Sequence, residues 1–168
     1  MKVAWQIAVL AIVYAVVARL CLLVQLPGTQ ATAVWLPSGI AFASLYVGGL
    51  RLWPGVWLGA LLANTWISVH SGNAGNLALA TAALIACGNM AEGVMLARFA
   101  GHPLRVKSFV PVILAACAVA AISGPLTLWT FGVLQGEHVW LVGATWFAGD
   151  VGGVLAVIPY LLWRQHGR

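Results

Sequence analysis

Three ionisable residues, Arg19, Glu92 and Asp150, interrupt long apolar runs of the sequence. A charged side chain in the middle of a bilayer costs about 2.5–3.5 kcal/mol on the insertion scale, so such residues face the interior of a helix bundle. Asn64 and Asn89 fall at a similar central depth, and Asn89 shares a helix face with Glu92 because the two are three residues apart. We therefore expect Asn64, Asn89, Glu92 and Asp150 to form a polar pocket for a ligand or signal, with Arg19 as a candidate counter-ion.

The same residues also have a purely structural interpretation. An ion pair between Arg19 and Asp150, together with interhelical hydrogen bonds, would hold helices together without binding anything. Because Arg19 could neutralise only one of the two acids, Glu92 would remain as an unpaired acid in the interior. The sequence therefore leaves both interpretations open.

Glycines near these residues are spaced for close helix packing. Gly55 and Gly59 form one small-xxx-small pair, and Gly149 and Gly153 form another. We expect packing rather than binding from all four. The second pair flanks Asp150, so a neighbouring helix would approach that carboxylate.

Other chemistries lack the residues that they need. All histidines lie in loops or in the tail, which leaves no pair inside the bilayer to hold a haem. The three cysteines have neither CxxC spacing nor a histidine neighbour, so no zinc site is indicated. We expect no metal, no cofactor and no catalytic residue.

The composition excludes a soluble globule. Of 168 residues, 62% are hydrophobic and 7% charged, against about 45–50% and about 25% in soluble domains. Because 62% of 168 is about 104 residues, the chain can supply five or six spans of about 20 residues each. The net charge of +5 does not indicate nucleic-acid binding, because the basic residues stand at the ends of apolar runs.

Charged residues, proline and glycine divide the chain into six predicted spans: 3–26, 31–50, 52–69, 77–99, 109–131 and 139–163. The second span contains Pro37 and the third begins at Pro54. These two are therefore either complete spans or a broken, re-entrant pair. The predicted fold class is an all-α polytopic membrane bundle of about six helices with a proline-broken second and third pair.

The basic residues predict the orientation. Seven of the eight fall at ends that an even-numbered zigzag places on one side, the exception being Arg19. The positive-inside rule then predicts a multi-pass protein with both termini in the cytoplasm.

Four motifs follow one another in a recognisable order: Ala33–Ala41, Leu52–Ala60 with Asn64, Gly88–Glu92, and Gly149–Val154 with Pro159. Together they resemble the MASE1 family, the membrane-associated sensor domain at the N-terminus of bacterial histidine kinases and diguanylate cyclases. The resemblance covers about residues 5–163. It implies one sensor domain over residues 1–168 in the bacterial inner membrane, without enzymatic activity of its own.

The resemblance also implies partners. A signal bound in the pocket would pass through the C-terminal helix to a cytoplasmic output domain or a partner membrane protein. Family members often continue into such an output domain, whereas this chain stops after the sixth predicted span. A fragment, a short stand-alone member and a subunit of a larger complex all remain open. The other expected partners are the lipid bilayer and a second copy in a homodimer, and nucleic acid is not expected.

Two further hypotheses compete with a sensory module. A small transporter or substrate-binding subunit would use the same acids to hold a cation or a proton, and the breaks near Pro37 and Pro54 favour it. The lack of a convincing internal repeat counts against it. A scaffold whose polar residues only assemble helices is the remaining alternative.

Overall fold

The computed structural model describes residues 2–23, 32, 34–72 and 75–167, and these contain helices and no strand. The helices are α1 (Lys2–Leu22), α2 (Leu36–Gly48), α3 (Trp53–His70), α4 (Gly75–Phe99), α5 (Val106–Thr130) and α6 (Val139–His166). Short 3₁₀ turns occupy Leu50–Leu52 and Gly136–His138. Within the described ranges five helices are long and apolar enough to cross a membrane, and α2 is a shorter apolar helix. The predicted all-α polytopic bundle is confirmed.

The second predicted span is wrong in length. Its helix has 13 residues, which rise only about 20 Å against a hydrocarbon core of about 30 Å. Pro37 lies in the first turn of α2, where its missing N–H leaves no hydrogen bond unmade. Before the helix, the Trp35 N–H donates to the carbonyl of Gly149 on α6, at 2.8 Å, and not to a residue near it in the sequence. The second and third predicted spans are therefore a short helix, α2, followed by a longer one, α3. This agrees with the alternative in which the two form a broken pair.

The turn between α2 and α3 depends on one glycine. Gly49 has a φ of 92° and donates its N–H to Leu45 O at 3.0 Å. A positive φ of this size favours glycine over any residue with a Cβ. Pro54 then stands in the first turn of α3, so the chain reverses within a few residues.

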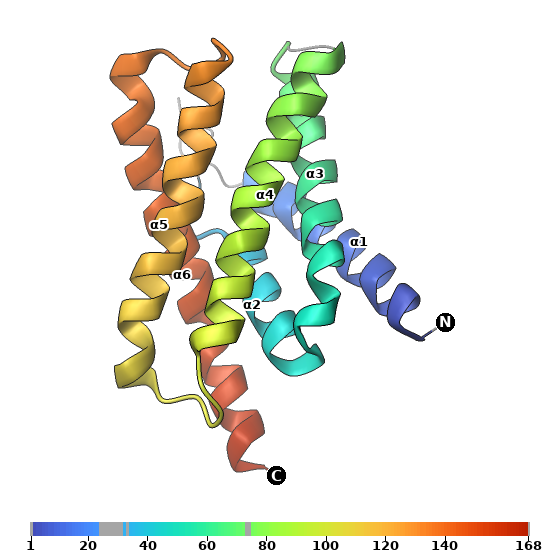
Figure 1. Cartoon of the computed structure of the whole chain (residues 1–168), viewed down its shortest axis with the longest axis vertical. Coiled ribbons are helices and arrows are strands. Elements are labelled where there is room, and N and C mark those ends of the chain that lie inside the picture. The colour runs from blue at the N-terminus through green and yellow to red at the C-terminus, as the bar shows by residue number, and fades with distance from the viewer. Residues whose placement is uncertain (1, 24–31, 33, 73–74, 168) are drawn as a thin grey trace.

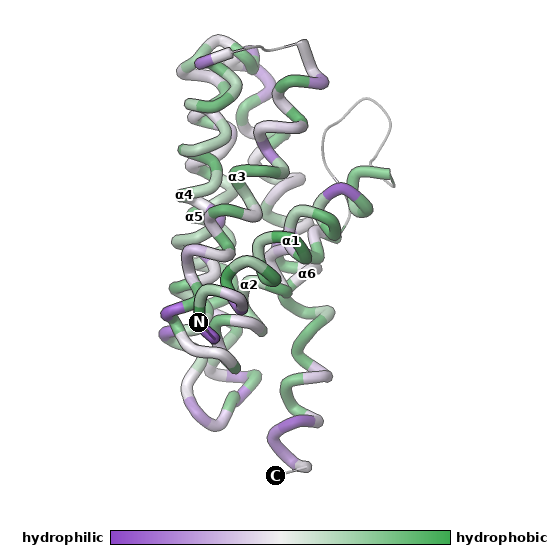
Figure 2. The backbone as a smooth tube through the Cα atoms, turned by 90° about the vertical axis from the view of Figure 1, so that its right-hand side faces the viewer, coloured by the Kyte–Doolittle hydropathy of each residue, from purple (hydrophilic) through white to green (hydrophobic). Residues whose placement is uncertain are grey.

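The helices form an antiparallel bundle that α1 crosses obliquely (Figures 1 and 2). Along the bundle α3 packs on α4 and α4 on α5, while α5 packs on α6. The short α2 lies against both α4 and α6, and α1 lies against α3. Figure 1 shows that α2 occupies only the half of the bundle nearer to the C-terminus, so its first turn begins deep inside.

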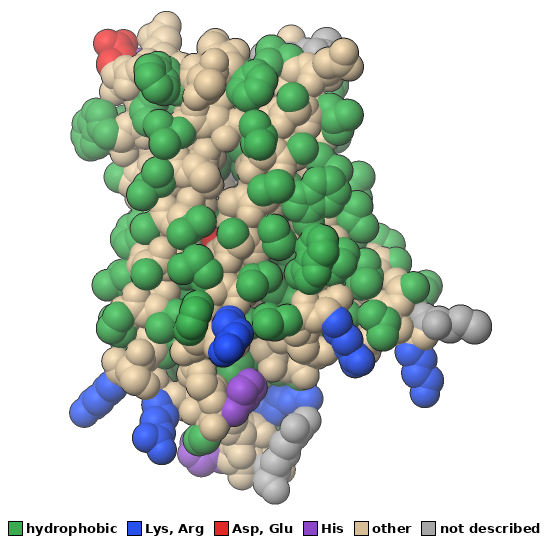
Figure 3. Space-filling model, in the orientation of Figure 1, with side chains coloured by type: hydrophobic (Ala, Val, Ile, Leu, Met, Phe, Trp, Pro, Cys, Tyr) green, Lys and Arg blue, Asp and Glu red, His purple; other side chains and the backbone are tan. Residues whose placement is uncertain are grey.

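Lysine and arginine gather at one end of the bundle, which we call the basic end (Figure 3). It carries the last turns of α6, the α2–α3 turn and the loop between α4 and α5, and α1 begins on the flank of the bundle in the same half (Figure 1). Hydrophobic side chains cover the middle, and an acidic side chain lies at the opposite end (Figure 3). Over the described residues this is the one-sided distribution that the sequence predicts for cations at span ends.

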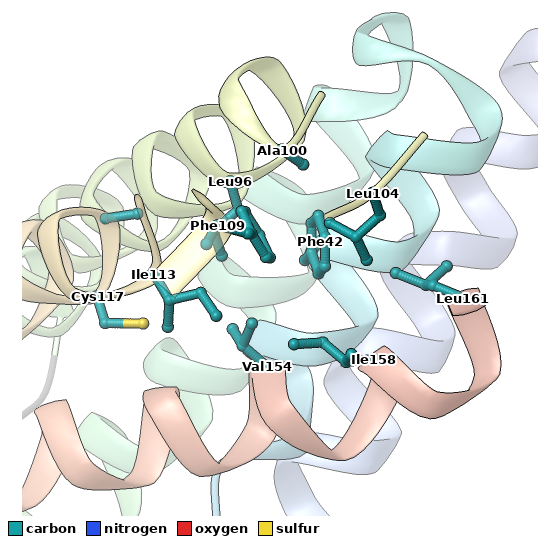
Figure 4. Packing of buried hydrophobic residues seen from close by; sticks show 11 residues of the cluster. Phe42, Leu96, Ala100, Leu104, Phe109, Ile113, Cys117, Val154, Ile158 and Leu161 are labelled. Carbon is teal, nitrogen blue, oxygen red and sulfur yellow. The ribbon is translucent and has the colours of Figure 1, made fainter. Parts of the chain in front are cut away.

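The hydrophobic core on the basic side is built around α2. Phe42 is completely buried, and its ring centroid lies 4.9 Å from that of Phe109 on α5. Figure 4 shows these two rings between Leu96 of α4 and Val154 of α6. Phe42 therefore connects α2 to the three helices around it, and this fixes the position at which α2 begins.

Glycines allow the closest helix contacts. A Cβ at Gly55 would lie 2.8 Å from Ile7 O, and a Cβ at Gly59 would lie 2.7 Å from the Tyr14 Cβ, so α1 and α3 touch at both points. A Cβ at Gly149 would lie 2.8 Å from Thr32 O.

Gly153 is the tightest of these positions. A Cβ there would overlap the Trp35 carbonyl, and one at Gly39 would overlap the Gly153 carbonyl. The second pair thus lies against the chain entering α2, beside Asp150.

Candidate functional site

Two buried acids meet where α2 begins. Glu92 on α4 is 1% exposed and Asp150 on α6 is 4% exposed. The Ser38 hydroxyl, in the first turn of α2, donates to Asp150 Oδ1 at 2.8 Å. The Cys117 thiol of α5 lies 3.5 Å from Glu92 Oε1, and the two carboxyl groups are close enough to interact electrostatically. Four helices thus bring one polar group each to a single point in the bundle interior.

The N-terminus of α2 contributes to the electrostatics of this cluster. The first N–H groups of a helix have no partner within the helix, and the helix dipole is positive at that end. Asp150 reaches this turn through Ser38, and Trp35 at the cap position supplies no side-chain capping bond. A helix that begins inside the bundle therefore places a partial positive charge beside a buried carboxylate.

Arg19 lies apart from the acids. Its guanidinium carbon is 2.7 Å from the centroid of the Trp66 ring on α3, and its Nη1 is buried without a hydrogen-bond partner. Among the described residues, the ion pair found is the one between His138 and Glu137, so none joins Arg19 to Asp150. The pairing considered in the structural interpretation of the sequence is therefore absent from this structure, and Arg19 is held by a cation–π contact.

A cavity of about 80 Å³ adjoins Asp150. Asn64 and Asn89 line it with Asp150, as do the indole rings of Trp35 and Trp146. A buried water needs about 10–15 Å³ in this measure, so the cavity has room for several waters or a small solute. Glu92 and Arg19 do not line it. Three of the five residues predicted for the pocket thus share the cavity wall, and Glu92 lies behind them.

The cavity extends toward the end opposite the basic end. Ile67 of α3 and Val133 of the α5–α6 connection line it there. Figure 1 shows the α3–α4 and α5–α6 pairs apart at that end. In Figure 3 acidic atoms are visible at mid-height between hydrophobic side chains. The cavity wall thus reaches from Asp150 toward the end opposite the basic end.

Sequence reasoning missed Ser38, which is 3% exposed and is the direct hydrogen-bond partner of Asp150. Its signal was the Leu36-Pro37-Ser38 order, since proline favours a first helical turn and serine then stands near the new N-terminus. Nothing in the sequence placed Cys117 in a site, because the cysteines have neither CxxC spacing nor a histidine neighbour.

Tyr14 was missed as well. It is 1% exposed, and its hydroxyl lies near the Trp35 and Asn89 side chains. That hydroxyl is buried and makes no hydrogen bond of good geometry. Glu92 Oε2 is buried and unpartnered in the same way. Since buried polar atoms are nearly always paired, these two atoms have hydrogen-bonding capacity that the described residues do not fully use.

The residues present do not form a metal centre. No group of three or more His, Cys, Asp or Glu is placed to hold a metal ion in the part of the chain that the structure describes.

In a comparison with known families, the family model described as MASE1 matches residues 6–168. Comparison with curated proteins and with solved structures gives no significant match. The order of motifs noted in the sequence and the family model therefore agree over nearly the whole chain.

Proposed function

The chain belongs to the MASE1 family of membrane-associated sensory domains, and from this we propose that it binds a signal in the cavity beside Asp150 and transmits it through α6. The module itself performs no catalysis. Its partner is a cytoplasmic output domain or another membrane protein. A homodimer is the assembly in which the movement of α6 would be transmitted.

One observation carries the proposal: two buried carboxyl groups, Glu92 and Asp150, lie together, and none of the described basic residues forms an ion pair with them. Burying a charge without a partner is costly, and removing one partner from a buried pair costs about 3–5 kcal/mol. A bound solute that compensates the acids would therefore favour one helix arrangement over another. The size of the shift equals the difference in its affinity for the two arrangements.

Helix α6 supports a route to the cytoplasm. It is one continuous helix of 28 residues that carries Asp150 in its middle and projects beyond its neighbours at the basic end (Figure 2). Near its end, Gln165 Oε1 accepts hydrogen bonds from the Leu104 N–H and from the Tyr46 hydroxyl. A displacement of α6 at Asp150 would therefore move these contacts with α2 and with the α4–α5 loop.

The proposed orientation is that of an inner-membrane protein with the basic end in the cytoplasm. In a chain whose native cysteines are replaced by alanine, Glu137→Cys and His166→Cys place one thiol at each end. A membrane-impermeant thiol reagent applied to intact spheroplasts should label Glu137→Cys, and label His166→Cys only after the membrane is permeabilised. The reverse pattern would overturn the orientation and place the cavity entrance in the cytoplasm.

The signalling proposal is tested in a fusion of the C-terminus to a reporter output domain. Glu92→Gln and Asp150→Asn should each change the ratio of active to inactive reporter by about fivefold or more, the usual range of coupling between sites. Glu137→Gln is the matched control, because this third acid is exposed at the opposite end and its side chain is 76% accessible. Its replacement should leave the output unchanged at equal membrane abundance.

Two results would contradict the signalling proposal. Unchanged output from both buried variants would remove the pocket from the mechanism. An equal response from Glu137→Gln would show that net charge, and not the buried cluster, sets the output.

A transporter is the second candidate, because α2 begins inside the bundle beside the acids. Half-helices with termini at mid-membrane line the binding sites of transporters. Solute flux into proteoliposomes that contain the purified chain separates the two candidates. An input module produces no flux above that of protein-free vesicles.

A further inference from the structure

We propose that the solute bound in the cavity beside Asp150 is a small primary ammonium ion that enters from the end opposite the basic end. The inference rests on the proposed function and names the chemical class of the signal.

Three side chains on the cavity wall donate their hydrogen bonds within their own helices. The hydroxyl groups of Thr81 and Thr145 and the amide nitrogen of Asn64 each donate to a carbonyl of their own helix, at 2.8–2.9 Å. A hydroxyl oxygen retains lone pairs after donating, and an amide keeps its carbonyl oxygen. These side chains therefore offer acceptors to the cavity, and a solute rich in N–H donors matches them.

The charged side chains at the cavity also favour a cation, because they are acidic. Asp150 lines the cavity, Glu92 lies behind it with Oε2 unpartnered, and none of the lining residues is Lys or Arg. Arg19 is stacked on the Trp66 ring and is not among the residues that line the cavity. An anion would be repelled by this negative potential, whereas a cation would be attracted by it.

Size and shape restrict the cation. The volume of about 80 Å³ is roughly half of an engineered cavity of about 150 Å³ that holds benzene. Trp35 and Trp146 on the wall can stabilise a cation near a ring face, within about 6 Å of its centroid. An ammonium group supplies three N–H donors, so methylammonium or ethylammonium fits both the donors required and the space.

Equilibrium binding of radiolabelled methylammonium to the purified chain in lipid nanodiscs tests this. Competition at constant ionic strength should show displacement by ethylammonium, but not by ethanol or acetate, which have similar size and no positive charge. Asp150→Asn should weaken binding about tenfold or more, and Thr145→Val about threefold, since one acceptor is lost.

Thr127→Val is the matched control for Thr145→Val. Thr127 makes the same kind of bond to its own helix, at 2.8 Å to Ser123 O, but does not line the cavity. It should leave methylammonium binding unchanged. If Asp150→Asn does not insert into the membrane, the comparison of Thr145→Val with Thr127→Val still tests the inference.

The outcomes separate this inference from the proposed function. Displacement by acetate or ethanol, or binding that ignores both Asp150→Asn and Thr145→Val, overturns the ammonium ion. Absence of methylammonium binding does so too, and the reporter fusion then judges the sensory proposal independently. A changed output in Asp150→Asn would retain the cavity as a signal site for another solute, and an unchanged output in both acid variants would reject both.

Discussion

Replacing Gly153 by alanine is expected to destabilise the bundle by about 3 kcal/mol or more, at the upper end of overpacking effects. The added Cβ would overlap the backbone carbonyl of Trp35, which has no rotamer with which to move away. The same residue is fixed by its N–H, which donates to Gly149 O at 2.8 Å. The start of α2 would therefore have to separate from α6. We expect a lower midpoint in reversible unfolding by sodium dodecyl sulfate, followed by far-ultraviolet circular dichroism.

Gly93→Ala provides the control for this prediction. Its Cβ would lie 3.1 Å from the Ala41 Cβ and 3.5 Å from Leu45 Cδ1, so α2 and α4 need to separate by only a few tenths of an ångström, whereas a Cβ at Gly153 would overlap a backbone carbonyl. Alanine also gains about 1 kcal/mol over glycine in helix propensity. We expect the net change to stay within about 1 kcal/mol. A loss equal to that of Gly153→Ala would mean that backbone contact between α2 and α6 is not what makes Gly153 sensitive.

Much of the fold could be predicted because the bilayer sets a simple length requirement. Apolar runs bounded by basic residues give the five long helices to within a few residues, as with the predicted span 77–99 and helix Gly75–Phe99. The second predicted span failed because hydropathy records which residues lie in the bilayer, not which of them are helical. The backbone before Leu36 bonds across the bundle to Gly149, and no local pattern contains that contact.

The sequence predicted how deep in the bilayer the site residues lie, but not which neighbouring helix each of them faces. Glu92 and Asp150 are buried because exposure to lipid is costly, so their inward orientation follows from residue type alone. Arg19 shows the limit of that reasoning, since its long side chain found the Trp66 ring of α3 instead of a carboxylate. Helices that are apolar on all sides carry little information on which face meets which neighbour. Ser38 became a partner of Asp150 only because α2 begins beside α6.

The ionisation of Asp150 can be measured through its hydrogen bond with Ser38. Ser38→Ala removes the hydroxyl that donates to Oδ1 at 2.8 Å, and a hydrogen bond to a charged group contributes about 1.5–3 kcal/mol. In an Asp150→Asn background the acceptor is a neutral amide, for which the contribution is about 0.5–1.5 kcal/mol. We therefore expect a double-mutant cycle to give a coupling of about 1 kcal/mol, measured by the same unfolding titration.

Ser123→Ala is the matched control for the cycle, since its hydroxyl donates to Ala120 O of its own helix at 3.4 Å. It should cost the same in both backgrounds, because independent sites add. Equal costs of Ser38→Ala in the two backgrounds would show that Asp150 carries no negative charge beside Ser38. The acids would then be neutral without a ligand, and a cation would have to displace a proton in order to bind. A clear coupling would instead mean that α2 and Ser38 hold Asp150 ionised, ready for a positively charged solute.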